Sequence, residues 1–250
     1  VAASSGLHGS ARMPSAVVSH ACMNENHLTR SVPGASDPWP LLRKRGELSG
    51  GTALRLVIHG RSGGLISPCL QQIVDAVAER RTAPVELEVL TAEHPSPVQC
   101  DSQWLVPLLL LPGSHARSDV PLIRERLKAE GVVVKSLPFL GAWDCWWGLM
   151  SCWIADVAAK HPSLALVHHP LRPGLSDRFL ASIQGRFDLP VVPFDVWDQF
   201  AIDHPNVVPL PLSLAPNRMS EALRQAGGLP SLLENPQLRQ GLIHCLALLP

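Results

Sequence analysis

The chain has 250 residues, enough for one large or two small domains. Its 21 basic and 21 acidic side chains balance, whereas nucleic-acid-binding proteins usually carry a basic surplus, so the composition argues against a nucleic-acid partner. No apolar run reaches the roughly 18 residues that a membrane-spanning helix needs, so we expect no membrane association.

Residues 1–53 are rich in Ser, Gly, Ala and Pro and show no hydrophobic periodicity. We expect this segment to be disordered or a non-native N-terminal extension. Its several arginines and few acids faintly resemble an organelle transit peptide, and a start codon assigned too far upstream is an equal alternative.

From residue 54 onward, strand-like and helix-like segments alternate. The predicted strands are 54–58, 84–90, 105–111 and 132–137, and the predicted helices are 67–81, 118–130 and a Trp-rich segment that ends near 160. Ser118 or Asp119 is expected to cap the second helix, and Pro121 suits its first turn. This alternation is typical of a parallel sheet with right-handed crossovers.

Residues 162–250 repeat the same plan in a degraded form, with predicted strands at 164–168, 189–194 and 207–212. Asn217 falls at the position that corresponds to His115, so the copy has lost one histidine. The sequence therefore predicts an α/β protein of two pseudo-repeated three-layer halves, 54–161 and 162–250. We expect a four-stranded parallel sheet flanked by helices in each half and a ligand cleft between the halves.

Two histidines follow predicted strands of the first half. His59 comes directly after strand 54–58 and opens a Gly-rich turn, and His115 lies in the loop after strand 105–111. Ligands of open α/β sheets usually bind at the carboxyl ends of strands, so we expect both imidazoles to face one cavity. For either histidine alone, a loop residue bonded to the backbone is the alternative interpretation.

These residues resemble the CbiX-type class II chelatases, the sirohydrochlorin cobaltochelatases and ferrochelatases, in their long two-domain form. The resemblance rests on five segments: His59-Gly60, His94-Pro95-Ser96, Val106-Pro107-Leu108, Gly113 to Pro121, and Leu140-Gly141. It implies a chelatase-like fold and a lyase that inserts Fe²⁺ or Co²⁺ into sirohydrochlorin, in siroheme or cobalamin biosynthesis. It further implies that His59 and His115 bind the metal and help to take protons from the pyrrole nitrogens. The metal is then a substrate, and no cofactor is bound permanently.

The sequence departs from the family pattern at three places. Thr91 stands where the family usually has a glutamate; Glu93 is nearby and is a candidate catalytic residue, although it is out of phase by one side-chain alternation. The connecting helix of the family is much shortened between Pro97 and Trp104. Trp143 replaces a histidine that the family carries after Leu140-Gly141.

Sirohydrochlorin carries many carboxylates, and arginine side chains and backbone N–H groups near helix starts suit such anions. The candidate substrate-binding residues are Arg61, Ser62, Gly113, Ser114 and Arg117. For the two arginines, a solvated surface position is an equal alternative. Asp119 is expected to be a helix cap rather than a base.

The six cysteines include no C-x-x-C pair, which is typical of reduced cytosolic thiols and favours a cytoplasmic protein. We expect a monomer with two pseudo-symmetric halves, whose partners are a tetrapyrrole and a divalent metal. The alternative function is a non-catalytic relative that binds a tetrapyrrole or a metal, suggested by Thr91 and Asn217. A metal-dependent hydrolase is less favoured because carboxylates are scarce near the histidines.

Overall fold

The structure, a computed structural model, describes residues 38–39, 42 and 52–250. Most of the predicted N-terminal extension, 1–53, therefore lies outside the described residues. Trp39 departs from the expected disorder: it is buried, its indole N–H donates to the carbonyl oxygen of Cys245 at 2.8 Å, and its ring meets Trp143 edge-on. In the part of the chain that is described, no helix is both long and apolar enough to cross a membrane.

The first sheet has four parallel strands, as the sequence predicts, and their order is β2-β1-β3-β4. The strands are β1 (Ala53–Ile58), β2 (Val85–Val89), β3 (Ser102–Pro107) and β4 (Val133–Ser136). β1 is central, and its Leu56 pairs with Leu87 on β2 and with Val106 on β3. Every residue of β1 is buried, because helices cover both faces of a parallel sheet.

The second sheet is also parallel, but it has three strands, β6-β5-β7, and the predicted fourth strand is absent from the described residues. Its strands are β5 (Leu164–His168), β6 (Val191–Pro193) and β7 (Val208–Pro211). Only the N–H of Leu229, which donates to the carbonyl of Pro209, continues the ladder, as Leu137 does toward Leu105 in the first sheet. The sequence of β7 explains why pairing stops: the N–H groups of Val208 and Leu212 face β5, so residues 209 and 211 face the open edge, and both are prolines with no N–H to donate.

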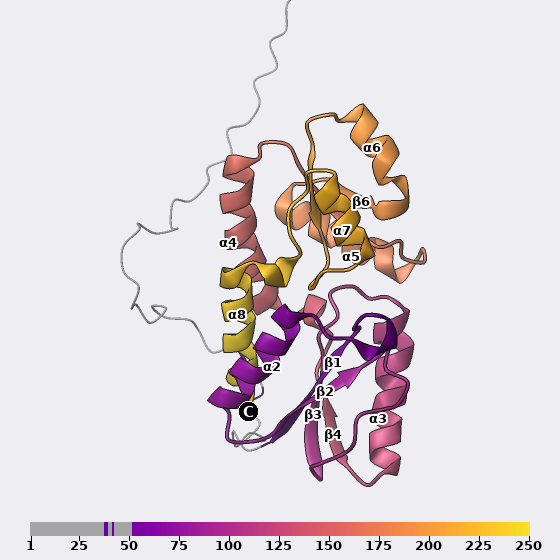
Figure 1. The fold of residues 1–250 in the computed structure, drawn as a ribbon, viewed down its shortest axis with the longest axis vertical. Coiled ribbons are helices and arrows are strands. Elements are labelled where there is room, and N and C mark those ends of the chain that lie inside the picture. The colour runs from indigo at the N-terminus through magenta and orange to yellow at the C-terminus, as the bar shows by residue number, and fades with distance from the viewer. Residues whose placement is uncertain (1–37, 40–41, 43–51) are drawn as a thin grey trace, which may run out of the picture. The chain divides into compact units, whose positions relative to one another are not determined.

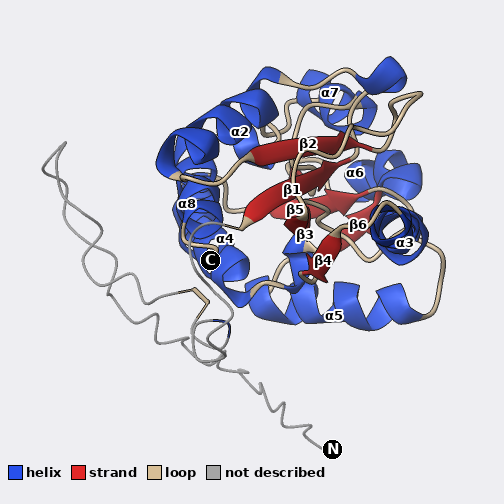
Figure 2. Ribbon diagram, turned by 90° about the horizontal axis from the view of Figure 1, so that it is seen from below, coloured by secondary structure: helices blue, strands red, loops and turns tan. Residues whose placement is uncertain are grey.

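Helices form the outer layers around both sheets (Figure 2). They are α2 (Pro68–Arg80), α3 (Val120–Ala129), α4 (Asp144–Lys160), α5 (Leu175–Phe187), α6 (Trp197–Asp203), α7 (Arg218–Gln225) and α8 (Pro236–Ala247). Alternate residues of β1 point to opposite faces, so Leu56 packs in the core with α2 and Val57 packs in the core with α3. This pattern gives the three layers that the sequence predicts.

For description, residues 52–161 around the first sheet are called the first lobe, and residues 162–250 around the second sheet the second lobe. Helix α8 belongs to the second lobe by sequence but packs beside α2 and α4 (Figure 1). The Arg81 guanidinium holds it there by donating to the carbonyls of Ala247 and Leu249. The largest hydrophobic core contains residues of both sheets. The predicted domain boundary between residues 161 and 162 stays a prediction.

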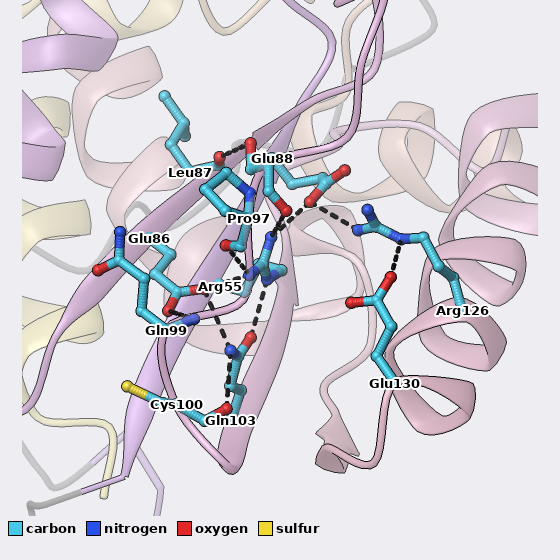
Figure 3. Close-up of polar contacts among 11 residues, drawn as sticks. Arg55, Glu86, Leu87, Glu88, Pro97, Gln99, Cys100, Gln103, Arg126 and Glu130 are labelled. Atoms are coloured by element: carbon cyan, nitrogen blue, oxygen red, sulfur yellow. Dashed lines mark hydrogen bonds and ion pairs between the residues drawn. The ribbon is translucent and has the colours of Figure 1, made fainter.

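The chain connection from β2 to β3 is a loop in place of the helix that the resemblance implies, and a buried arginine of β1 binds it (Figure 3). Arg55 on β1 is fully buried and pairs with Glu86 and with Glu88, the latter at 2.6 Å. Its guanidinium also donates to the loop carbonyls of Ser96 and Pro97, at 3.2 and 2.9 Å. The loop is therefore anchored by charge rather than by helix packing.

Candidate functional site

The structure brings the two predicted histidines together. His59 directly follows β1, and His115 lies beyond the neighbouring strand β3, so both imidazoles lie at the carboxyl edge of the first sheet. Their ring centroids are 4.7 Å apart, and the rings meet edge-on at 73°. Both residues remain solvent-accessible, so a ligand can reach them.

Both imidazoles have one ring nitrogen fixed by a hydrogen bond. Nδ1 of His59 lies 2.8 Å from the carbonyl oxygen of Gly60, and Nδ1 of His115 lies 2.5 Å from Oδ2 of Asp119. A carbonyl oxygen and a carboxylate oxygen can only accept, so Nδ1 must donate in each ring. In the neutral ring Nε2 then carries the lone pair, which is the arrangement that metal-binding histidines usually have.

The helix that carries His115 begins earlier than the sequence predicts. A π-helical turn, η2 (His115–Asp119), precedes α3, and the N–H of Val120 donates to the carbonyl of His115. His115 is thus in the first helical turn rather than in a loop. The expected capping role of Asp119 is wrong, because its side chain makes no capping hydrogen bond and instead accepts from His115. The signal for this contact, a His-x-x-x-Asp spacing on one helix, is present in the sequence.

We expect Asp119→Asn to lower any metal-dependent activity of the site by about tenfold or more, because replacing a carboxylate that orients a metal-binding histidine typically costs 10- to 100-fold. The measurement is the initial rate, together with the affinity for Co²⁺, of the purified variant. Ser118→Ala in the same turn is the control and should leave both values unchanged. An unchanged rate in the Asp119 variant would remove Asp119 from the site.

Thr91 stands at the position of the family's glutamate and binds the turn that follows His59. Its hydroxyl donates to the carbonyl of Arg61 at 2.5 Å. Gly60 has φ +74°, and a Cβ atom there would lie 2.3 Å from the side chain of Val89 and 2.7 Å from that of Thr91, so only glycine fits.

Glu93 is exposed and, within the described residues, makes no hydrogen bond or ion pair with either histidine. Its catalytic role stays a prediction.

The other predicted binding residues are placed as follows. Ser62, Ser114 and Arg117 are exposed near the two histidines in sequence, as substrate-binding groups would be. The N–H of Gly113 donates to the carbonyl of Leu111 at 2.8 Å, so this N–H is already used within the loop.

The second lobe presents a matching but altered pair, His169 after β5 and Asn217 before α7. Oδ1 of Asn217 accepts from the N–H of Ser220 at 2.9 Å, and this cap directs the amide nitrogen to Oγ of Ser213 and to Nε2 of His169, at 2.9 and 3.4 Å. Asn217 therefore meets His169 much as His115 meets His59. The pKa of His169 is lowered by desolvation and, after it, by the charge of His59, which indicates that the two lobes' histidines lie within electrostatic reach.

Arg61 connects the two lobes beside the histidines. Its guanidinium donates to Oε1 of Glu221 on α7 at 2.5 Å and to the carbonyl of Pro216 at 3.2 Å. The carboxyl edges of the two sheets therefore meet at the residues around His59. The sequence assigns Arg61 to the carboxylates of a substrate, and in this structure a carboxylate of the chain itself holds it.

The metal-ligand set at this site is small. Across residues 38–39, 42 and 52–250, no three histidine, cysteine, aspartate or glutamate side chains are arranged to hold a metal ion. Neutral imidazole is a good ligand for Fe²⁺ and Co²⁺.

No protein-family model and no curated protein matches the sequence, but solved structures match the fold. The sirohydrochlorin chelatase SirB from Bacillus subtilis subspecies spizizenii, in complex with cobalt, is 16% identical over 78% of this chain and 94% of its own, with a TM-score of 0.52. CbiX, the terminal enzyme for siroheme biosynthesis in denitrifying bacteria, is 21% identical over 78% and 97%, with a TM-score of 0.54. SirB from Bacillus subtilis with Fe³⁺ is 15% identical over 78% and 93%, with a TM-score of 0.58. The chain therefore has the fold of the sirohydrochlorin chelatases.

Proposed function

We propose that this protein is a chelatase that inserts Fe²⁺ or Co²⁺ into sirohydrochlorin. The observation that carries the proposal is the His59–His115 pair at the carboxyl edge of the first sheet, with Nδ1 of each ring fixed by an acceptor. The likeness to SirB and CbiX supports the proposal at the level of the fold.

The chemistry requires the metal to lose water and two pyrrole N–H protons to leave the macrocycle. The Nε2 lone pairs of His59 and His115 are suited to both tasks in turn: each would first bind the metal and, once the metal has passed to the ring nitrogens, would be free to accept a pyrrole proton. When His115 accepts a proton at Nε2, the carboxylate of Asp119 stabilises the imidazolium through Nδ1. With His59 and His115 as its protein ligands, the metal would keep coordination positions for the ring nitrogens.

The macrocycle's carboxylates need cationic and hydrogen-bonding partners around this pair. Arg61 and Arg117 are assigned to them, with the hydroxyls of Ser62 and Ser114 as donors. All four residues have solvent-exposed surfaces and lie in the same two chain segments as the histidines.

The second candidate is a protein that binds the tetrapyrrole without turnover. It is favoured by Thr91, whose hydroxyl binds the carbonyl of Arg61 at the position where the resemblance implies a carboxylate. It is also favoured by Asn217, which stands in place of a histidine in the second lobe. Neither residue can take a proton from a pyrrole nitrogen at neutral pH.

The test is to incubate the purified protein with sirohydrochlorin and Co²⁺ and to follow the change in absorbance of the macrocycle. A chelatase gives a rate above that of the spontaneous reaction and proportional to protein concentration. Tight binding of the macrocycle with only the spontaneous rate would support the second candidate. Failure to bind sirohydrochlorin would contradict both.

A further inference from the structure

The main chain of Arg61 is held within its own turn, whereas its side chain is held by partners from the second lobe. Its N–H donates to the carbonyl of Leu65 at 2.7 Å, and its own carbonyl accepts from Thr91 Oγ1 at 2.5 Å and from the N–H of Gly64 at 3.1 Å. The guanidinium lies 47% exposed at the end of a flexible stem. The side chain of Arg61 can therefore change partner while the turn that carries His59 stays in place.

The present partner of this guanidinium comes from the other lobe. Glu221 is in the first turn of α7, which Asn217 caps, and its side chain is 50% exposed. Solvent reaches both members of the ion pair, so another carboxylate can compete for Arg61. An exposed pair of this kind contributes little stability, so the exchange has a low cost.

We propose that Glu221 is an internal competitor that occupies Arg61 until a carboxylate of the incoming macrocycle displaces it. The proposal rests on the proposed function, because it takes sirohydrochlorin as the ligand. Glu221 is then a specificity-determining residue, because a ring with few carboxylates cannot both replace Glu221 at Arg61 and pair with Arg117. Exchange also releases Arg61 from Pro216 and so breaks the contacts that join the lobes beside His59.

The test measures the Kd of metal-free sirohydrochlorin for the whole protein by titration of its absorbance. Glu221→Gln keeps the size of the side chain and removes its charge, and we expect the Kd to fall by about threefold to fivefold, as an exposed ion pair allows. This gain should shrink at high salt because exposed charges are screened.

A double-mutant cycle separates competition for Arg61 from a general effect of charge. In an Arg61→Gln background, Glu221→Gln should change the Kd little, because the group for which it competes is gone. Glu125→Gln is the matched control, because Glu125 is an exposed acid on α3 whose ion-pair partner is Lys128, at 3.0 Å, in the same helix. The Kd of sirohydrochlorin for this variant should equal that for the wild type.

The outcomes distinguish this inference from the proposed function. An unchanged or higher Kd in Glu221→Gln overturns the competition even if the wild type inserts metal. An equal gain with and without Arg61 overturns it as well. A wild type that binds the macrocycle without inserting metal overturns only the chelatase activity, and the cycle of Kd values then still decides the role of Glu221. A wild type that does not bind sirohydrochlorin overturns both.

Discussion

Replacing His115 with alanine is expected to lower metal insertion into sirohydrochlorin by about 100-fold or more, the range typical for the loss of a positioned proton-transfer group. The change removes one of two imidazoles whose centroids lie 4.7 Å apart, and under the proposed function it removes a metal ligand and a proton acceptor together. We expect a large fall in kcat/KM and weaker binding of Co²⁺. The measurement is the initial rate from macrocycle absorbance, with Co²⁺ affinity determined separately.

The control for this prediction is another exposed histidine on a helix. His244 lies on α8 and has no contact with the His59–His115 pair in the described structure, so His244→Ala should keep the wild-type rate. The side chain of His115 is 43% exposed, so the His115 variant should unfold at nearly the same temperature as the wild type. A variant that folds and still turns over at the wild-type rate would show that the site is assigned wrongly.

Much of the first lobe could be predicted from sequence because strands that are buried on both faces leave a strong local signal. The segment of β1, apolar except for Arg55 and followed at once by His59 and a Gly-rich turn, predicts the strand and the position of the imidazole. The neighbouring position of β3 follows from the usual rules for parallel sheets, and with it the approach of His115. These inferences need only short segments and general topology.

The residues that surround the histidines were harder to predict because their contacts depend on tertiary structure. Arg61 and Glu221 are 160 positions apart, and no local pattern assigns one to the other. Asp119 shows a different difficulty: acids before a helix usually cap it, and that general preference outweighed the specific His-x-x-x-Asp spacing. The missing fourth strand of the second sheet follows from Pro209 and Pro211, whose orientation toward the open edge is known only once β7 is paired with β5.

The buried charges were also missed, although Arg55 stands out as the only charged residue in β1. Its partners are contributed by β2, β3 and the loop between them, so the network becomes visible only once the strands are paired (Figure 3). Glu86 and Glu88 alternate with apolar residues in β2, which suggests a solvated face from sequence. In the structure that face is closed by the loop that Arg55 anchors.

Arg55→Met is therefore expected to destabilise the protein by about 3–5 kcal/mol, the cost typical of removing one partner from a buried ion pair. Arg55 is fully buried, and its loss leaves the carboxylates of Glu86 and Glu88, both buried, without their shared cation. The loop carbonyls of Ser96 and Pro97 lose their donor as well. The measurement is the free energy of unfolding from urea denaturation.

Arg126→Met is the matched control, because Arg126 also pairs with Glu88, at 2.9 Å, but its side chain is 25% exposed. Its replacement leaves Arg55 in place and should cost only about 1 kcal/mol or less. Replacing Arg55, Glu86 and Glu88 together by apolar residues of similar size should recover the stability lost to unpaired buried charges, while the loss from the loop carbonyls and from buried Gln103 remains. If Arg55→Met alone were as stable as the wild type, the network would contribute nothing to holding the β2–β3 loop.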